Sequence, residues 1–202
     1  RANDDENDIY RKAVALPASE RPPEIYYLKV DDRKVPVELR TPINVKLFEG
    51  AKTIVLHVEP YRVFKYGPIS FRFPREYSWR TTDQNPLGPT WQIEGPKVGI
   101  MVTCYKDTEE HDELRRAIID RIIDAYRTSG KVTEKKLSAN LGETKLEGIE
   151  LRIEMGTVHL RQEIYSIKAG KDSFVFLIQA VDGEQPSEGR KMLFDTFKIA
   201  KE

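Results

Sequence analysis

The sequence predicts an α+β fold, in which an antiparallel β-sheet is sandwiched by helices and preceded by a small β-rich unit. Its apolar segments are mostly short, rich in β-branched and aromatic residues, and separated by turn residues, which is typical of strands. The clearest helical periodicity lies between residues 107 and 130. A length of 202 residues allows one main domain with an appendage. We place an N-terminal unit at residues 1–65 and the α+β domain at residues 66–202.

The N-terminal unit is predicted to be a short helix followed by two hairpins. Acidic residues precede an apolar stripe with helical spacing in residues 4–14, and prolines in residues 16–24 end that helix. Paired strands are then expected at residues 25–30, 35–39, 43–48 and 53–64. Because two-stranded ribbons are marginal alone, we expect this unit to dock on the main domain.

The main domain begins with an aromatic-rich stretch, YGPISFRFPREYSW at residues 66–79. Ile69, Phe71 and Phe73 alternate with polar residues, which predicts a half-buried strand that Pro74 ends. Its rings are therefore expected in the core rather than on a binding platform. Further strands are expected at residues 90–93, 98–105, 132–137, 148–155, 158–167 and 174–181, and a short helix at 187–194. The last of these strands lacks alternation, so we expect it at the centre of the sheet.

The helix between residues 107 and 130 is predicted from its ends and its periodicity. Asp107 and Glu110 have the spacing of a capping box. Apolar residues then recur on one face as far as Tyr126, and Gly130 supplies the stop. The opposite face is charged, which is typical of a solvated surface.

The hairpin around Gly156 gives the sharpest prediction, because glycine at the first central position is typical of a type II′ turn. Met155 then lies opposite Val158, and the apolar residues of both strands share one face, which we expect to face the core. The other face holds six polar residues in three opposed pairs, Glu154 with His159, Arg152 with Arg161, and Glu150 with Glu163.

These six polar residues are the candidate binding site of the sequence. Like charges directly opposite are unfavourable, so we expect compensation along the diagonals, from Arg152 to Glu163 and from Glu150 to Arg161. One interpretation is a solvated outer sheet face, which is ordinary for half-exposed sheets. The other is a docking or ligand surface on which the two arginines grip a carboxylate. His159 with Glu154 supplies too few ligands for a metal site.

Composition and motifs argue against several other classes. The net charge is zero, and residues 1–65 carry 12 Lys and Arg against 11 Asp and Glu, so no basic face for nucleic acid is expected. No stretch is apolar enough to predict a membrane span. Cys104 lies in an apolar strand and is expected in the core. His57 and His111 accompany no nucleophile signature, and no metal, phosphate or dinucleotide motif indicates a cofactor.

The C-terminal two-thirds resembles the superfamily of PsbP-like proteins of photosystem II and Ran-binding nuclear-import factors, which also includes bacterial DcrB-like lipoproteins. The resemblance covers about residues 66–200. It is carried by ISFRFPREYSW, by VGIMVTCY before a long helix, by Leu146-Glu147-Gly148 before a strand, and by FVFLIQAV before KMLFDTFKI. It implies an α/β/α sandwich on an antiparallel sheet, in proteins that act mainly by binding others or assisting assembly. It carries over no site residue.

We therefore expect a non-enzymatic binding or assembly module, exported from a bacterium, that docks a protein partner through its sheet face or its N-terminal unit. Two alternatives stay open. One is a small-ligand or metal carrier that uses a cleft between the N-terminal unit and the sheet. The other is a hydrolase whose site assembles from residues distant in the sequence. The sequence indicates neither the partner's identity nor the oligomeric state.

Overall fold

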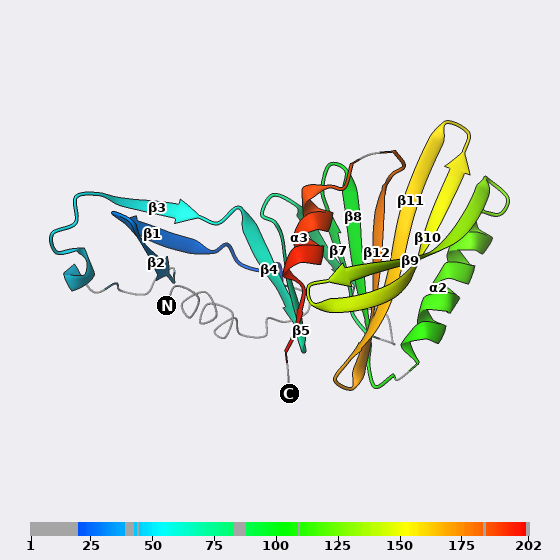
Figure 1. The fold of residues 1–202 in the computed structure, drawn as a ribbon, viewed down its shortest axis with the longest axis horizontal. Coiled ribbons are helices and arrows are strands. Elements are labelled where there is room, and N and C mark those ends of the chain that lie inside the picture. The colour runs from blue at the N-terminus through cyan, green and yellow to red at the C-terminus, as the bar shows by residue number, and fades with distance from the viewer. Residues whose placement is uncertain are drawn as a thin grey trace.

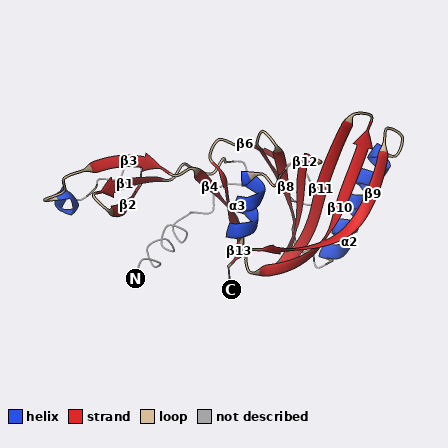
Figure 2. Cartoon of the chain, turned by 45° about the horizontal axis from the view of Figure 1, so that its top comes forward, coloured by secondary structure: helices blue, strands red, loops and turns tan. Residues whose placement is uncertain are grey.

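The structure, a computed structural model, describes residues 20–38, 43, 45–82, 88–108, 110–183 and 185–200. Within them the chain forms mostly antiparallel strands with two α-helices, which confirms the α+β class (Figures 1 and 2). The helix expected in residues 4–14 lies outside the described residues. The elements are β1 (Tyr26–Val30), β2 (Arg33–Val37), a 3₁₀ turn (Val45–Phe48), β3 (Ile54–Val58), β4 (Tyr61–Tyr66), β5 (Ile69–Pro74), β6 (Ser78–Thr82), β7 (Thr90–Glu94), β8 (Val98–Tyr105), α2 (His111–Tyr126), β9 (Lys131–Leu141), β10 (Thr144–Met155), β11 (Val158–Ala169), β12 (Asp172–Val181), α3 (Glu188–Thr196) and β13 (Lys198–Ile199).

The body of the protein is a seven-stranded antiparallel sheet in the order β6-β7-β8-β12-β11-β10-β9. β12 is the middle strand, as its unbroken apolar sequence predicts. Its Phe174 and Phe176 face one apolar cluster and its Val175 faces another, so both of its faces are covered. A strand buried on both sides has no polar face to turn to water, and this is why it occupies the centre.

The two faces of this sheet are covered by different elements (Figure 1). On one face α2 packs across β11 and β12, and its Ile119 contacts Leu151 and Ile164 of the sheet. On the other face lie α3 and a second sheet in the order β13-β5-β4. Phe71 of β5 meets Phe176 of β12 there, with ring centroids 6.4 Å apart. The aromatic strand at residues 69–74 is thus a core strand, as predicted.

A third sheet, in the order β2-β1-β3, extends away from the body (Figure 1). We call it the projecting sheet. It joins the body through β4, which directly follows β3, and through Arg62 on that strand. The Arg62 guanidinium donates to the Pro22 carbonyl and to Glu24 Oε1 at 2.9 Å, and so holds the chain entering β1. Arg21 adds a hydrogen bond of 2.7 Å to the Tyr77 carbonyl of the body.

The projecting sheet differs from the two hairpins that the sequence predicts. The first hairpin, β1 with β2, is confirmed. The second is wrong, because Val45–Phe48 forms a 3₁₀ turn and β3 pairs with β1 instead. Asp31 explains part of this choice: its side chain accepts hydrogen bonds from the backbone N–H groups of Lys52 and Thr53, and ties the start of β3 to the β1–β2 turn.

The ends of the two helices follow different rules. The capping box expected for α2 is wrong, because Asp107 lies in a turn with a φ of 53° and the cap residue Glu110 makes no side-chain cap hydrogen bond. The short C-terminal helix is confirmed as α3. Its cap, Ser187, accepts from the Arg190 N–H at 3.2 Å, as a serine at this position is expected to do.

The central position of β12 predicts where the fold is most sensitive. Replacing Phe176 with Ala should lower the free energy of unfolding by about 3–5 kcal/mol, because it empties a fully buried ring site. Urea denaturation followed by circular dichroism measures this loss. Val181→Ala, at the exposed end of the same strand, is the control and should change stability by less than about 0.5 kcal/mol. Equal losses in the two variants would contradict this placement of β12.

Candidate functional site

The hairpin register predicted around Gly156 is confirmed at every pair. Met155 lies opposite Val158, and the three polar pairs, Glu154 with His159, Arg152 with Arg161, and Glu150 with Glu163, are opposed as expected. Gly156 has a φ of 57° while Thr157 has no positive φ, which fits a type II′ turn. The apolar face of the hairpin packs on α2, because Leu151 and Ile164 belong to the α2 cluster.

The polar face of this hairpin is not one solvated surface. It continues into the face that holds the main core, since Tyr165 follows Glu163 two residues later on the same side. Glu163 is 5% exposed. The Arg190 guanidinium of α3 reaches it with hydrogen bonds of 3.1 and 2.8 Å, and the Tyr165 hydroxyl donates to it at 2.9 Å. Glu163 therefore anchors α3 and is closed to a partner.

Electrostatics around Glu163 follow from this burial. Burial alone would lower the pKa of Arg190, but the hydrogen bonds and the charge of Glu163 outweigh it, so that the pKa is raised. Burial, with the Glu163 charge second, raises the pKa of the Tyr165 hydroxyl. With both pKa values raised, the Arg190 guanidinium stays charged and the Tyr165 hydroxyl stays protonated at neutral pH.

The two arginines of this face pair mainly with a glutamate on their own strand. Arg152 Nε lies 2.8 Å from Glu150 Oε1, and Arg152 Nη1 lies 3.8 Å from Asp182 Oδ2. Arg161 Nε lies 3.7 Å from Glu163 Oε1. These contacts differ from the expected diagonals, because residues two apart on one strand lie on the same face and their side chains lean along it. Arg152, Glu154 and His159 are exposed, and Glu150 and Arg161 are half-buried.

The pair between Glu163 and Arg190 can be tested by breaking it. Glu163→Ala leaves the half-buried Arg190 guanidinium and the buried Tyr165 hydroxyl without their partner, and should cost about 3 kcal/mol of unfolding free energy. Glu154→Ala, on the same face but exposed, should cost less than about 0.5 kcal/mol. Chemical denaturation of both variants measures the difference, and a mild Glu163→Ala variant would mean that α3 is held by its apolar contacts alone.

The projecting sheet has an apolar face and a polar face. The register of its three strands puts eight residues on the apolar side together with Arg33: Tyr26, Leu28, Val30, Val35, Val37, Ile54, Leu56 and Val58. The polar side carries Lys29, Lys34 and His57, with Tyr27 stacked on His57 at 5.1 Å and Lys34 over the Tyr27 ring at 4.2 Å. Exposure of the apolar side is highest at β3, where Leu56 is 57% and Ile54 48% exposed.

The backbone of β3 is open along its outer edge within the described residues. The Asp31 N–H donates to the Thr53 carbonyl and the Glu59 N–H donates to the Ile25 carbonyl, so the odd-numbered residues of β3 point their backbone groups at β1. Backbone groups alternate in direction along an antiparallel strand. Those of Ile54, Leu56 and Val58 therefore point outward, on the same residues whose side chains form the apolar face. We call these three residues the β3 edge.

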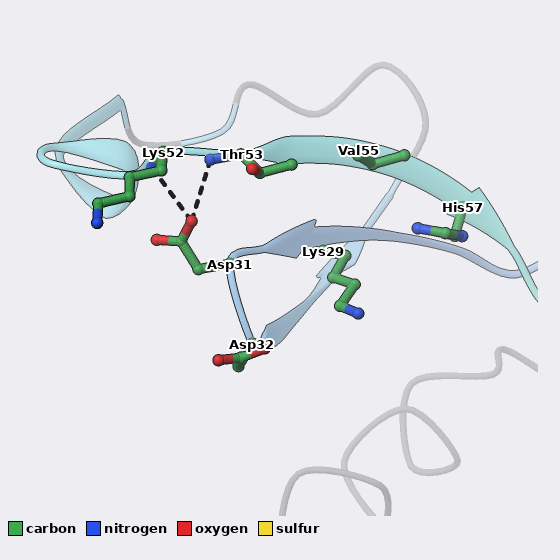
Figure 3. Close-up of a pocket in the computed structure, with 7 residues that line it drawn as sticks. All are labelled: Lys29, Asp31, Asp32, Lys52, Thr53, Val55 and His57. Atoms are coloured by element: carbon green, nitrogen blue, oxygen red, sulfur yellow. Dashed lines mark hydrogen bonds between the residues drawn. The ribbon is translucent and has the colours of Figure 1, made fainter.

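A shallow open depression lies on the polar side of the projecting sheet (Figure 3). It is lined by Lys29, Asp31, Asp32, Lys52, Thr53, Val55 and His57. One carboxylate oxygen of Asp31 already accepts hydrogen bonds from the backbone N–H groups of Lys52 and Thr53. The depression mixes charges of both signs and is not enclosed, so it lacks the desolvation that would make a small ligand bind tightly.

A serine, a histidine and an aspartate meet where α2 begins, at Ser166, His111 and Asp112. Ser166 Oγ lies 3.1 Å and Asp112 Oδ1 lies 3.3 Å from the same ring nitrogen, His111 Nδ1. A nucleophilic triad needs the two groups on opposite nitrogens of the ring. Arg115 also donates to Ser166 Oγ, at 3.2 Å, and Ser166 is buried. The cluster ties the first turn of α2 to β11 and does not have the geometry of a hydrolytic site.

The part of the chain that the structure describes shows neither a metal site nor a membrane-spanning helix. No three His, Cys, Asp or Glu side chains are placed there to hold a metal ion, and no helix there is long and apolar enough to cross a membrane. Cys104 is fully buried in the main core, as predicted, and burial raises the pKa of its thiol to about 12.

The raised pKa of Cys104 makes the stability of the fold depend on pH in a known direction. The unfolded chain loses this proton near the ordinary thiol pKa of about 8.5, whereas the folded chain keeps it to about pH 12, so stability falls as pH rises through this window and is unaffected below it. In native protein at pH 8, a thiol reagent such as DTNB should label Cys104 only as fast as the chain unfolds. Full labelling in urea is the control, and rapid labelling of native protein would contradict the buried position.

Comparisons with known proteins assign no family to the chain. No family model and no curated protein matches it. Matches are found among solved structures, including a crystal structure from Bacteroides thetaiotaomicron VPI-5482 at 1.50 Å resolution. That protein is 9% identical with a TM-score of 0.46, and the similarity covers 71% of this chain and 50% of the other. This chain therefore spans about half the length of that structure.

Sequence reasoning named the polar hairpin face and missed the β3 edge. The missed signal is the segment IVLHV at residues 54–58, which has no charged residue and no proline. Such a segment is expected in the middle of a sheet, and its place at an edge becomes visible only when β1 is seen to be its sole neighbour among the described strands.

Proposed function

We propose that this protein is a non-enzymatic docking or assembly module and that it binds a partner protein at the β3 edge. One observation carries the proposal: Ile54 and Leu56 are large and apolar, and are 48% and 57% exposed on the same face of a strand whose outer backbone groups are open within the described residues. Contiguous exposed apolar residues of this kind mark interaction sites. A strand from the partner can pair with the open edge while its side chains cover the apolar face.

The polar hairpin face supports docking less well. Glu163 is closed off by Arg190, and Arg152 already has Glu150 and Asp182 as ion-pair partners. A carboxylate that approached Arg152 would exchange one exposed ion pair for another, a gain of about 0–1 kcal/mol. Burying the exposed parts of Leu56 and Ile54 offers about 1–2 kcal/mol each. The apolar edge is therefore the better candidate surface.

We also propose the PsbP-like class for the main domain. The proposal is supported by the arrangement of α2 against one face of the antiparallel sheet and α3 against the other, since the resemblance implies an α/β/α sandwich. An experimental structure with both helices on one face would contradict it.

The docking proposal is tested with a charge at the centre of the edge. A partner captured from the native host and then purified should bind the Leu56→Lys variant at least about tenfold more weakly than the parent chain by isothermal titration calorimetry, because a lysine there must be desolvated on binding. Val181→Lys is the matched control, since Val181 is equally exposed but lies on the body. Its affinity should be unchanged.

A second variant separates the two surfaces. If Arg152→Glu with Arg161→Glu abolishes binding and Leu56→Lys does not, the docking surface is the polar hairpin face and the β3 proposal is wrong. Protection of the β3 amides from hydrogen exchange in the complex would instead support strand pairing directly.

A further inference from the structure

Taking the proposed docking at the β3 edge as its premise, we infer that the strand which occupies it is β3 of a second copy of this chain. The two copies then join edge to edge, and their projecting sheets form one continuous antiparallel sheet across a two-fold axis. Three observations support this pairing. They are the residue composition of β3, the residues that flank its two ends, and the protection found on every other sheet edge that the structure describes.

The β3 edge is the one unguarded edge among the strands described. Sheet edges of natural proteins are protected from pairing by charges, prolines or short length. The other five edge strands, β2, β4, β6, β9 and β13, all carry such protection. The protecting residues are Arg33, Lys34 and Pro36 in β2, Arg62 and Lys65 in β4, Arg80 in β6, Lys131, Glu134, Lys135 and Lys136 in β9, and Lys198 in the two-residue β13.

β3 has no such residue between Ile54 and Val58, and its single polar side chain is His57. An edge left in this state is either covered in the assembled protein or is free to aggregate. Among the described strands five edges are protected and one is open, which points to an edge that is used.

A second copy is a suitable occupant because an antiparallel ladder is itself two-fold symmetric. The same strand can lie opposite itself with every outward backbone group paired. The two-fold axis must stand perpendicular to the sheet, since only then do the apolar faces of both copies lie on one side. Residues of one face must therefore oppose residues of the same face, so even-numbered residues pair with even-numbered ones.

The residues at the ends of β3 select the register. Centring on Leu56 opposes Ile54 with Val58 of the second copy, uses the whole strand, and leaves Lys52 and Pro60 outside the pairing. Shifting the centre to Val55 would oppose Lys52 with Val58. Shifting it to His57 would oppose two histidines and bring Pro60, which has no N–H, against an Ile54 carbonyl. The register centred on Leu56 alone avoids both defects.

This register also opposes apolar residues with apolar residues on the apolar side and avoids like charges. Val55 lies opposite His57 of the second copy on the polar side, and no like charges are opposed within the paired residues. On the apolar side the opposed residues are Ile54, Leu56 and Val58 of each copy. The paired segment is about 17 Å long, so the contact lies at the small end of specific interfaces and should form a reversible, concentration-dependent dimer.

The test uses the fact that Leu56 lies opposite itself. Sedimentation velocity of the full chain from micromolar to about millimolar concentration should show a shift from monomer to dimer. Leu56→Lys and Leu56→Glu should each be monomeric, because each opposes two like charges. An equimolar mixture of the two variants should recover the dimer, since lysine then faces glutamate. Val181→Lys and Val181→Glu are the matched controls, and each should dimerise alone as the parent chain does.

Each outcome decides between the two claims. A parent chain that stays monomeric throughout, or variants whose mixture does not recover the dimer, would overturn pairing between two copies in this register. If, in that case, a purified partner still loses affinity for Leu56→Lys, the occupant is the partner's strand and the docking proposal stands. If Leu56→Lys changes neither association nor partner binding, the docking proposal fails as well.

Discussion

The need to cover β12 on both faces organises the rest of the structure. Phe176 points to one side of this strand and Val175 to the other, and neither side can face water without losing several kcal/mol of apolar burial. On one side the sixteen-residue helix α2 is long enough to cover the sheet. On the other side α3 has nine residues and covers only part of it, so the sheet β13-β5-β4 completes the layer with Phe64 and Phe71. The antiparallel body and its second sheet follow from that requirement.

The same covering sheet determines where the projecting sheet lies. β4 packs its buried residues on the body, and the chain that precedes it has to leave the body at Pro60. Arg62 then fixes the direction of departure, because its guanidinium holds Pro22 and Glu24 at the start of the projecting sheet. The result is a surface held at a distance from the core. A strand that contributed to the core would have no reason to keep its apolar residues exposed, whereas a strand held apart can present them to a partner.

The parts of the fold that depend on local pattern could be predicted from the sequence, and the parts that depend on distant neighbours could not. The register around Gly156 follows from turn chemistry and a period of two, which are properties of a few adjacent residues. The burial of Glu163 is different, because it depends on Arg190 in a helix 27 residues further along the chain. The exposed position of the β3 edge also depends on distant neighbours. IVLHV at residues 54–58 has the composition of a central strand, and its position at an edge follows from β3 joining β1 in place of the segment that forms the 3₁₀ turn.

The β3 edge is suited to strand pairing because contacts within the projecting sheet hold both of its ends before any partner arrives. The start of β3 is tied to the β1–β2 turn by Asp31. Its far end is fixed by Glu59, which is buried and paired with Lys34. Between them, stacking of Tyr27 on His57 holds β3 flat against β1. Ordering a loose strand would cost about 1–2 kcal/mol for each residue fixed, enough to cancel the gain from so short a contact. Because that cost is already met within the folded chain, most of the burial and hydrogen bonding at the edge is available to bind the incoming strand.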